Sequence, residues 1–181
     1  MKIAVDVMGG DNAPQAIIDG VLLAAGNKEN SDVQFVLVGQ KDIIISHLEG
    51  RSYPKNQIEI FNATESIGMD ESPVNAVKRK KDSSICRMLD LAKQGKVNAV
   101  VSAGNTGAVV VASAIKLRTL EGIDRPAITT VLPRPSGYWI LLDAGANAEC
   151  KPKNLFQFAV MGEVFAREII GIRNPKVGLM S

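Results

Sequence analysis

The pattern of apolar and polar positions alternates short apolar runs with segments of helical spacing, and most of the runs end at small or polar residues. The first apolar run, residues 2–8, leads through a glycine-rich turn into residues 15–25, where apolar side chains recur at helical spacing. Residues 33–39 then form a nearly continuous apolar run, which is typical of a strand covered on both faces. This order of strand, turn, helix and strand predicts an α/β protein with parallel strands.

The same pattern predicts elements along the whole chain. Strands are predicted over residues 2–8, 33–39, 57–61, 97–101, 128–132, 138–142 and 176–180, and helices over residues 15–25, 40–48, 74–81, 85–94, 109–117 and 153–170. The predicted fold class is an open, mainly parallel α/β sheet with helices on both faces. No linker, low-complexity tract or repeat divides residues 1–181, so we assign no internal boundary. Because ligand loops follow the strands of such sheets, a last strand at the end of the chain predicts a truncated, N-terminal portion of a longer protein.

The turn after the first strand carries two carboxylates and two glycines: Asp6, Gly9, Gly10 and Asp11. If the strand belongs to a parallel sheet, both carboxylates can face one crevice at its carboxyl end. The alternative is that Asp11 is a turn residue and Asp6 lies near an edge. Both interpretations stay open at this point.

The segment 102–108 follows another apolar run and precedes a helix. A helix begins with unpaired N–H groups at the positive end of its dipole, so small residues there leave room for an anion. Gly104 and Gly107 remove side chains, while Ser102, Asn105 and Thr106 supply hydroxyl and amide groups. This pattern predicts a phosphate-sized site; the alternative is that Asn105 and Thr106 only cap the helix.

Three further positions carry candidate charges for ligands. Lys80 and Lys81 end the helix over residues 74–81, where they either complement the helix dipole or meet phosphate or an acidic partner protein. Arg125 is a candidate anion ligand, unless it pairs with Asp124 or another carboxylate. Asp143 and Asn147 follow a predicted strand and form a third candidate ligand loop.

Composition narrows the function classes. The formal net charge of +2 and an aromatic content of 4% give no basis for nucleic acid binding. Lys2 leads directly into a strand-like run instead of a signal peptide, and no apolar segment reaches the length of a membrane span, so a cytoplasmic protein is predicted.

The cysteines and the histidine give little basis for covalent catalysis or for a metal. Cys86 and Cys150 are isolated, without the spacing of a metal site, and we interpret both as reduced structural thiols. His47 is the single histidine and lies away from the glycine-rich turns, which disfavours a hydrolase triad. No metal and no cofactor are predicted.

Taken together, the loops resemble those of the phosphate acyltransferase (PlsX) family of bacterial fatty acid and phospholipid synthesis. The matching stretches are AVDVMGGDNAP at 4–14, VKRKKDSS at 77–84, SAGNTGA at 102–108, GIDRPA at 122–127 and LLDAGAN at 141–147. Two departures are Val7, where the family usually has alanine, and the motif beginning at Val177, which stops before its usual continuation.

The resemblance implies an α/β fold akin to phosphotransacetylase and the isopropylmalate dehydrogenases, and a homodimer. It implies transfer of an acyl group from acyl carrier protein to orthophosphate, giving an acyl phosphate that a membrane acyltransferase consumes. It also implies peripheral membrane contact through a region outside this chain.

Since phosphate can attack a thioester directly, this chemistry suits a chain without a triad. We expect the turn 104–107, with Ser102 and Asn105, to hold phosphate or the developing oxyanion. Asp6, Asp11, Asp143 and Asn147 would orient groups around the cleft. Lys80, Lys81 and Arg125 would balance negative charge or meet the carrier protein. The alternatives are a non-catalytic module that binds phosphate or acyl carrier protein, and a phosphotransacetylase-like enzyme that uses coenzyme A thioesters.

Overall fold

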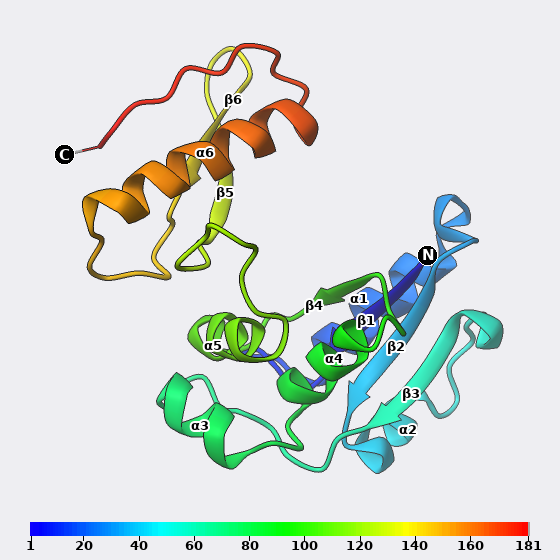
Figure 1. Ribbon diagram of the computed structural model, residues 1–181. Helices are drawn as coiled ribbons and strands as arrows, with labels where there is room; N and C mark the ends of the chain where they lie inside the picture. The colour runs from blue at the N-terminus through cyan, green and yellow to red at the C-terminus, as the bar shows by residue number, and fades with distance from the viewer. Residues whose placement is uncertain (181) are drawn as a thin grey trace. The chain divides into compact units, whose positions relative to one another are not determined.

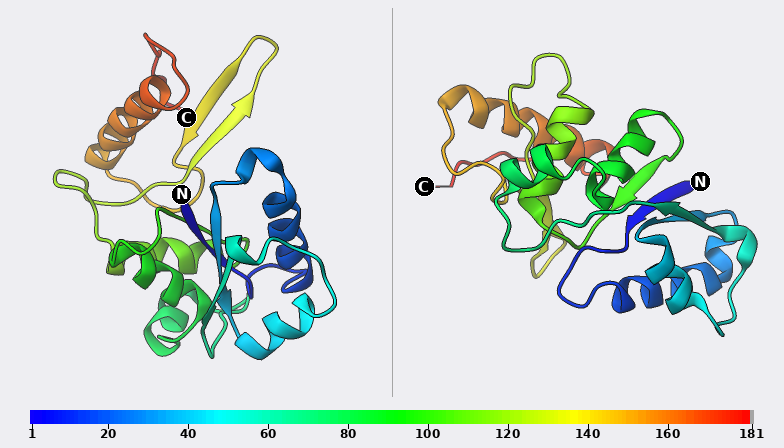
Figure 2. Two further views of the ribbon diagram at one scale, coloured as in Figure 1. Left: turned by 90° about the vertical axis from the view of Figure 1, so that its right-hand side faces the viewer. Right: turned by 90° about the horizontal axis from the view of Figure 1, so that it is seen from below.

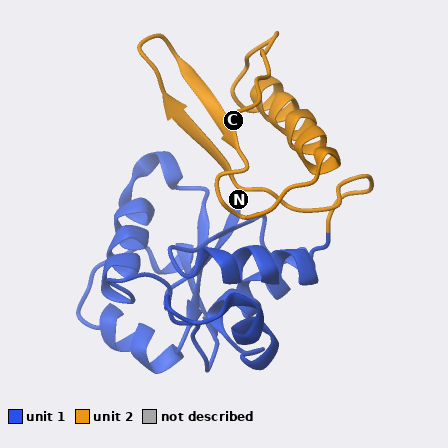
Figure 3. Cartoon of the chain, turned by 90° about the vertical axis from the view of Figure 1, so that its left-hand side faces the viewer, with its two compact units in different colours: residues 1–118 blue, residues 119–181 orange. Residues whose placement is uncertain are grey.

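The computed structural model describes residues 1–180. Contacts group the chain into two compact units, Met1–Arg118 and a second unit that begins at Thr119 (Figure 3). No domain boundary was predicted at this position from the sequence. Each unit is described by itself below.

Unit 1 is built around a four-stranded parallel sheet. In the order β3-β2-β1-β4, its strands are β1 (Lys2–Asp6), β2 (Gln34–Gly39), β3 (Ile58–Asn62) and β4 (Ala99–Val101) (Figure 1). The central strand β1 sets the register on both sides, because Val5 lies opposite Leu37 of β2 and Val101 of β4. The parallel sheet predicted from the apolar runs is therefore confirmed.

Helices cover both faces of this sheet, as predicted. Between the strands lie α1 (Gln15–Gly26), α2 (Lys41–Leu48), α3 (Pro73–Arg79), α4 (Ser84–Lys93) and α5 (Thr106–Lys116), with short 3-10 helices at Lys28–Asn30 and Lys55–Gln57. Figure 2 shows α1 and α2 on one side of the sheet and α3, α4 and α5 on the other. The predicted helix boundaries agree within about two residues at most ends.

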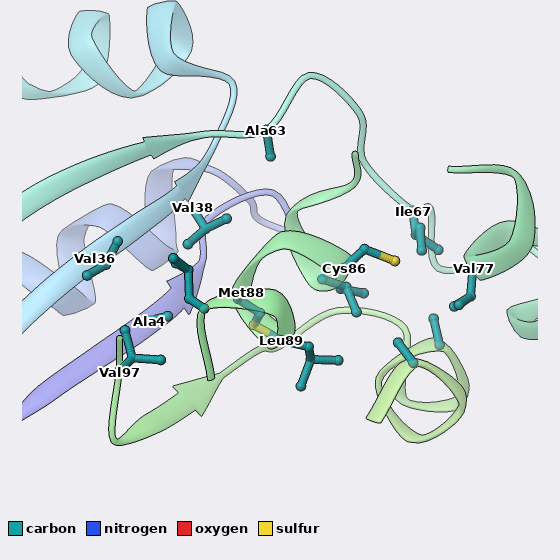
Figure 4. Packing of buried hydrophobic residues seen from close by; sticks show 14 of the residues in the cluster. Ala4, Val36, Val38, Ala63, Ile67, Val77, Cys86, Met88, Leu89 and Val97 are labelled. Atoms are coloured by element: carbon teal, nitrogen blue, oxygen red, sulfur yellow. The ribbon is translucent and has the colours of Figure 1, made fainter. Parts of the chain in front are cut away.

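Alternating side chains of the strands fill two hydrophobic clusters, one on each face. Val36 packs with Met88 and Leu89 of α4 in the first cluster (Figure 4), while the adjacent Leu37 packs with Ile18 of α1 and with α2 in the second. Since successive side chains of a strand point to opposite faces, one strand serves both clusters. Burial of each large apolar side chain stabilises the fold by roughly 1.5–3 kcal/mol.

The strand order creates a topological switch point beside β1. The chain moves outward from β1 to β2 and β3, and then returns to place β4 on the opposite side of β1. Loops that leave neighbouring strands in opposite directions open a crevice at their carboxyl ends, which is where ligands bind in open α/β sheets. The two glycine-rich turns singled out from the sequence follow β1 and β4, the strands that flank this point.

Unit 2 consists of an antiparallel hairpin and one long helix. Its elements are β5 (Thr129–Pro133), β6 (Tyr138–Leu142) and α6 (Pro152–Glu168). The hairpin confirms the predicted bend, which closes with a hydrogen bond of 3.1 Å from the Arg134 N–H to the Gly137 carbonyl. The prediction of a strand over residues 176–180 is wrong, because a strand requires a ladder partner and this segment pairs with none in the described part of the chain.

Candidate active site

The loops after β1 and β4 are joined by the side chain of Asp6, which is fully buried at 0% exposure. Its Oδ2 accepts a hydrogen bond of 2.7 Å from Ser102 Oγ, and its Oδ1 accepts one of 3.1 Å from the Met8 N–H. Ser102 Oγ in turn accepts a bond of 3.0 Å from the Gly104 N–H. Asp6 and Ser102 thus form a partly buried polar link at the switch point, whereas Asp11 lies exposed in the same loop as Gly9.

Glycines allow the two loops to touch. A Cβ added to Gly9 would collide with Asp6 Oδ2 and lie 2.8 Å from Gly104 Cα, inside the range that real Cβ atoms avoid. Gly10 has φ +112°, a backbone conformation that favours glycine, and its Cβ would lie 3.2 Å from the Ala103 carbonyl oxygen. The neighbouring loop, and not a ligand, therefore occupies the space beside these glycines.

Asn105 is the N-cap of α5, so the capping interpretation is confirmed for this residue. Its Oδ1 accepts a bond of 2.9 Å from the Ala108 N–H. Its Nδ2 also donates to three backbone carbonyls, those of Gly68 and Met69 at 3.1 Å and of Glu71 at 3.0 Å. Asn105 therefore fastens a third loop, residues 66–72 after β3, to the start of α5.

The start of α5 keeps two features of an anion site. Within residues 1–180, the N–H groups of Thr106 and Gly107 have no hydrogen-bond partner, and Thr106 is exposed. Unpaired N–H groups at the positive end of a helix favour a negative charge. Gly107 has a structural role as well, because a Cβ there would lie 2.5 Å from Cγ of Pro73 at the start of α3.

The structure separates the two lysines that the sequence placed together. Lys80 Nζ lies 2.5 Å from Glu71 Oε1 and donates a 2.8 Å bond to the Ser66 carbonyl, so it holds the 66–72 loop. Glu71 Oε1 also accepts the Gly68 N–H at 2.7 Å. The bond from Lys80 and then that from Gly68 hold the pKa of Glu71 below its usual value. Lys81 is exposed.

The 66–72 loop is the part of this site that the sequence analysis missed. It follows β3, so the rule that ligand loops leave the carboxyl ends of parallel strands applies to it as well. The polar run from Asn62 to Ser72 was the available signal. What the sequence could not show is which carbonyl groups the Asn105 amide reaches.

In unit 2, Asp143 organises the candidate loop through its carboxylate. Oδ1 accepts the N–H groups of Ile128 at 2.7 Å and of Ala146 at 3.2 Å, and Oδ2 accepts the N–H of Asn147 at 2.7 Å and its Nδ2 at 3.0 Å. Partial burial acts to raise the pKa of Asp143, but these hydrogen bonds outweigh it and keep the pKa below its usual value. Asn147 Nδ2 also donates to the Pro126 carbonyl at 2.9 Å.

Arg125 is exposed, and its Nη1 donates a 3.2 Å bond to the Glu149 carbonyl. The sequence left open a pairing of Arg125 with Asp124. Asp124 instead forms an ion pair with Lys153, with 3.0 Å between Asp124 Oδ2 and Lys153 Nζ. The guanidinium therefore keeps donor capacity for a ligand.

Three further features concern a metal site, the two cysteines and a membrane-spanning helix. Among residues 1–180, no cluster of three His, Cys, Asp or Glu side chains has an arrangement that could hold a metal ion. Cys86 is buried and Cys150 is exposed, and both are free thiols. Within the same range, no helix combines the length and the apolar character that crossing a bilayer requires.

The chain has an α/β fold that is similar to the fold of phosphotransacetylases. The phosphotransacetylase of Streptococcus pyogenes matches with a TM-score of 0.67 at 21% identity, covering 95% of this chain and 55% of that protein. The EutD phosphotransacetylase of Staphylococcus aureus matches with a TM-score of 0.63 at 22% identity, covering 92% of this chain and 52% of that one. At these identities the likeness establishes the fold.

The family follows from closer relatives. A family model described as "Fatty acid synthesis protein" matches residues 1–181, and the chain belongs to this family. Proteins named phosphate acyltransferase align over the whole chain at 49% identity in Desulfitobacterium hafniense and 44% in Clostridium tetani. The chain spans about half the length of these curated relatives, 53% and 54% respectively.

Proposed function

We propose that this protein is a phosphate acyltransferase that transfers an acyl group from acyl carrier protein to orthophosphate. The observation that carries the proposal is the alignment of all 181 residues with proteins named phosphate acyltransferase, at identities of 44% and 49%. The aligned region includes the loops that meet at the switch point of unit 1.

In the proposed reaction, a phosphate oxygen attacks the carbonyl carbon of the thioester. The new C–O bond gives the acyl phosphate, the C–S bond breaks, and sulfur leaves with the electron pair as a thiolate that takes a proton from solvent. A free thiol has a pKa of about 8.5, so expulsion of the thiolate needs no strong general acid. Catalysis then depends on positioning phosphate and on stabilising the oxyanion.

The free N–H groups of Thr106 and Gly107 are the proposed ligands of phosphate or of the developing oxyanion. Ser102 is a positioning residue for this turn, because it donates its one hydroxyl hydrogen to Asp6 and accepts the Gly104 N–H. Asp6 acts on Ser102 through their 2.7 Å hydrogen bond and fixes the direction of the hydroxyl. Asp11 is exposed and available to a substrate. Asn105 acts as a positioning residue, because both of its polar side-chain atoms are engaged with backbone groups.

The remaining candidate residues shape the loops or bind an anion in the proposal. Gly9, Gly10 and Gly104 set the approach of the two loops. Arg125 is the proposed anion ligand of unit 2, while Asp143 and Asn147 shape its loop.

The cellular setting is part of the same proposal. The acyl phosphate would serve phospholipid synthesis, and the protein would act as a cytoplasmic homodimer. Peripheral contact with the membrane would use residues outside this chain. The net charge of +2 gives no reason to add nucleic acid as a partner.

A coenzyme A thioester is the second candidate donor, since the fold is shared with phosphotransacetylases at TM-scores of 0.63 and 0.67. The two donors differ in the group that carries the thiol. The acyl group and the attacking phosphate are the same in both reactions.

The test measures acyl phosphate trapped with hydroxylamine when the folded chain meets orthophosphate and one long-chain acyl thioester. Acyl carrier protein and coenzyme A are compared as carriers, and the full-length relative from Desulfitobacterium hafniense serves as the positive control. We expect phosphate-dependent product with a preference for the carrier protein. Binding without turnover by the folded chain, while the relative is active, would contradict catalysis by this chain.

A further inference from the structure

The basic run at the end of α3 divides into one inward and three outward side chains. Lys80 contacts Glu71 and the Ser66 carbonyl, whereas Lys78, Arg79 and Lys81 are exposed. We call these three exposed residues the basic patch. The sequence grouped Lys80 with Lys81, and only the side-chain geometry separates them.

Two carboxylates next to this basic run, Glu71 and Asp82, are already engaged. Glu71 pairs with Lys80, and Asp82 lies 3.3 Å from Arg87 Nε while accepting Thr64 Oγ1 at 2.6 Å. In residues 1–180 the basic patch takes part in no ion pair within 4.0 Å. A cluster of unpaired cations on the surface produces a positive potential that attracts an acidic partner.

The basic patch lies at one end of a helix whose other end meets the candidate active site. Pro73, the first residue of α3, packs against Gly107 at the start of α5. With a rise of 1.5 Å per residue, the six steps from Pro73 to Arg79 span about 9 Å. A protein docked on the basic patch therefore has its contact surface close to the switch point.

Stabilisation of the helix dipole does not require three cations in this place. Dipole effects fall off within the last turn, and α3 has 7 residues, so a single cation at its end supplies most of the gain. Lys80, at the C-cap, already lies there. Three further exposed charges of one sign are better suited to recognition of a partner.

We propose that the basic patch docks an acidic face of the protein that delivers the acyl thioester. The proposal rests on the proposed function, because that function supplies a protein-bound substrate. Complementary charges at such a surface speed association and fix its register, and salt weakens them.

The decisive experiment compares two triple variants with equal changes of charge. The first reverses the basic patch, with Lys78→Glu, Arg79→Glu and Lys81→Glu. The control reverses Lys28, Lys55 and Lys96, which are exposed and precede β2, β3 and β4 at the amino ends of the strands. Circular dichroism and thermal unfolding verify that both variants are folded.

Binding of a long-chain acyl carrier protein is the readout, so the result does not depend on turnover. At low salt we expect the patch variant to bind about tenfold more weakly than the control variant, equivalent to about 1.4 kcal/mol. The difference should shrink at about 0.5 M salt, where charges more than a few ångströms apart are screened. Equal affinities of the two variants at low salt would overturn the docking proposal.

A second arm separates this proposal from the proposed function. Acyl phosphate formation from a coenzyme A thioester of the same acyl chain lacks the docked protein, so reversal of the basic patch should lower it by less than it lowers turnover of the carrier-protein thioester. If the unsubstituted protein turns over neither thioester, the proposed function is wrong. The binding comparison would still test whether the basic patch is the docking surface. If the triple variant does not fold, Lys78→Glu is compared with Lys28→Glu, so that the changes of charge are again equal.

Discussion

Unit 1 and unit 2 differ in the amount of hydrophobic packing that supports their candidate loops. In unit 1, clusters of 15 and 10 buried apolar residues lie on the two faces of the sheet. In the described part of unit 2, the buried apolar residues are Phe158 and Ala166, and the candidate loop is held by hydrogen bonds to Asp143. A carboxylate therefore organises the glycine-rich loops in both units, Asp6 in unit 1 and Asp143 in unit 2, but the loops of unit 1 also rest on a large hydrophobic core.

The largest effect is expected in the core of unit 1. Leu37 is 0% exposed in β2, and Leu37→Ala should lower the free energy of unfolding by about 2–5 kcal/mol through lost burial and a cavity. The matched change in unit 2 is Leu155→Ala, where the side chain is 38% exposed and a loss of roughly 0.5 kcal/mol is expected. Urea unfolding of both variants measures the contrast, and equal losses would refute it.

The contact between the loops after β1 and β4 gives the second prediction. Gly9→Ala should destabilise the protein by about 1–3 kcal/mol, because the new methyl group meets Asp6 and the Gly104 backbone. The control Gly20→Ala adds a methyl group in the interior of α1 with nothing within 4 Å, and it should stabilise the helix by about 0.5–1 kcal/mol. Thermal unfolding distinguishes these opposite signs; two small shifts of the same sign would mean that the loops do not touch.

The third prediction concerns Asn105. Asn105→Ala should lower the free energy of unfolding by about 1–2 kcal/mol, because the cap of α5 is removed. Because the Asn105 amide also holds residues 66–72, hydrogen exchange should accelerate at the Gly68 amide as well as at Ala108. Asn105→Asp keeps the acceptor for Ala108 and removes the donor. Protection of Ala108 with loss at Gly68 is the expected pattern for this second variant, and loss at both sites would contradict separate roles for the two polar atoms.

How much of this was predictable differs from residue to residue. The strands and the glycine turns followed from apolar runs and small residues, because local sequence determines both. The inward turn of Lys80 did not, since a run of four cations carries no sign of which one faces Glu71. Asp143 was predicted as a ligand residue from its place after a strand, but the four N–H groups that it accepts come from residues whose convergence depends on the folded loop.

The smallest effect is a pH dependence of unit 2. A carboxyl group whose pKa is lowered by folding contributes stability above its unfolded pKa of about 3.9, and that contribution is lost as pH falls through the lower folded value. For Asp143 the pKa is lowered, so acidification below about pH 4 should weaken unit 2. Asp143→Asn should flatten this part of the pH profile, as followed by exchange of the Asn147 amide, and an unchanged slope would contradict the assignment.

The most direct test of the central claim is a titration of the labelled chain with inorganic phosphate, followed by NMR of its backbone amides. The account predicts saturable shifts that are largest at Thr106 and Gly107, and Ser102→Ala should weaken them. Chloride at the same ionic strength should leave these amides unchanged. Saturable shifts that leave residues 102–107 unaffected would show that phosphate binds elsewhere and would contradict a phosphate site at the switch point of unit 1.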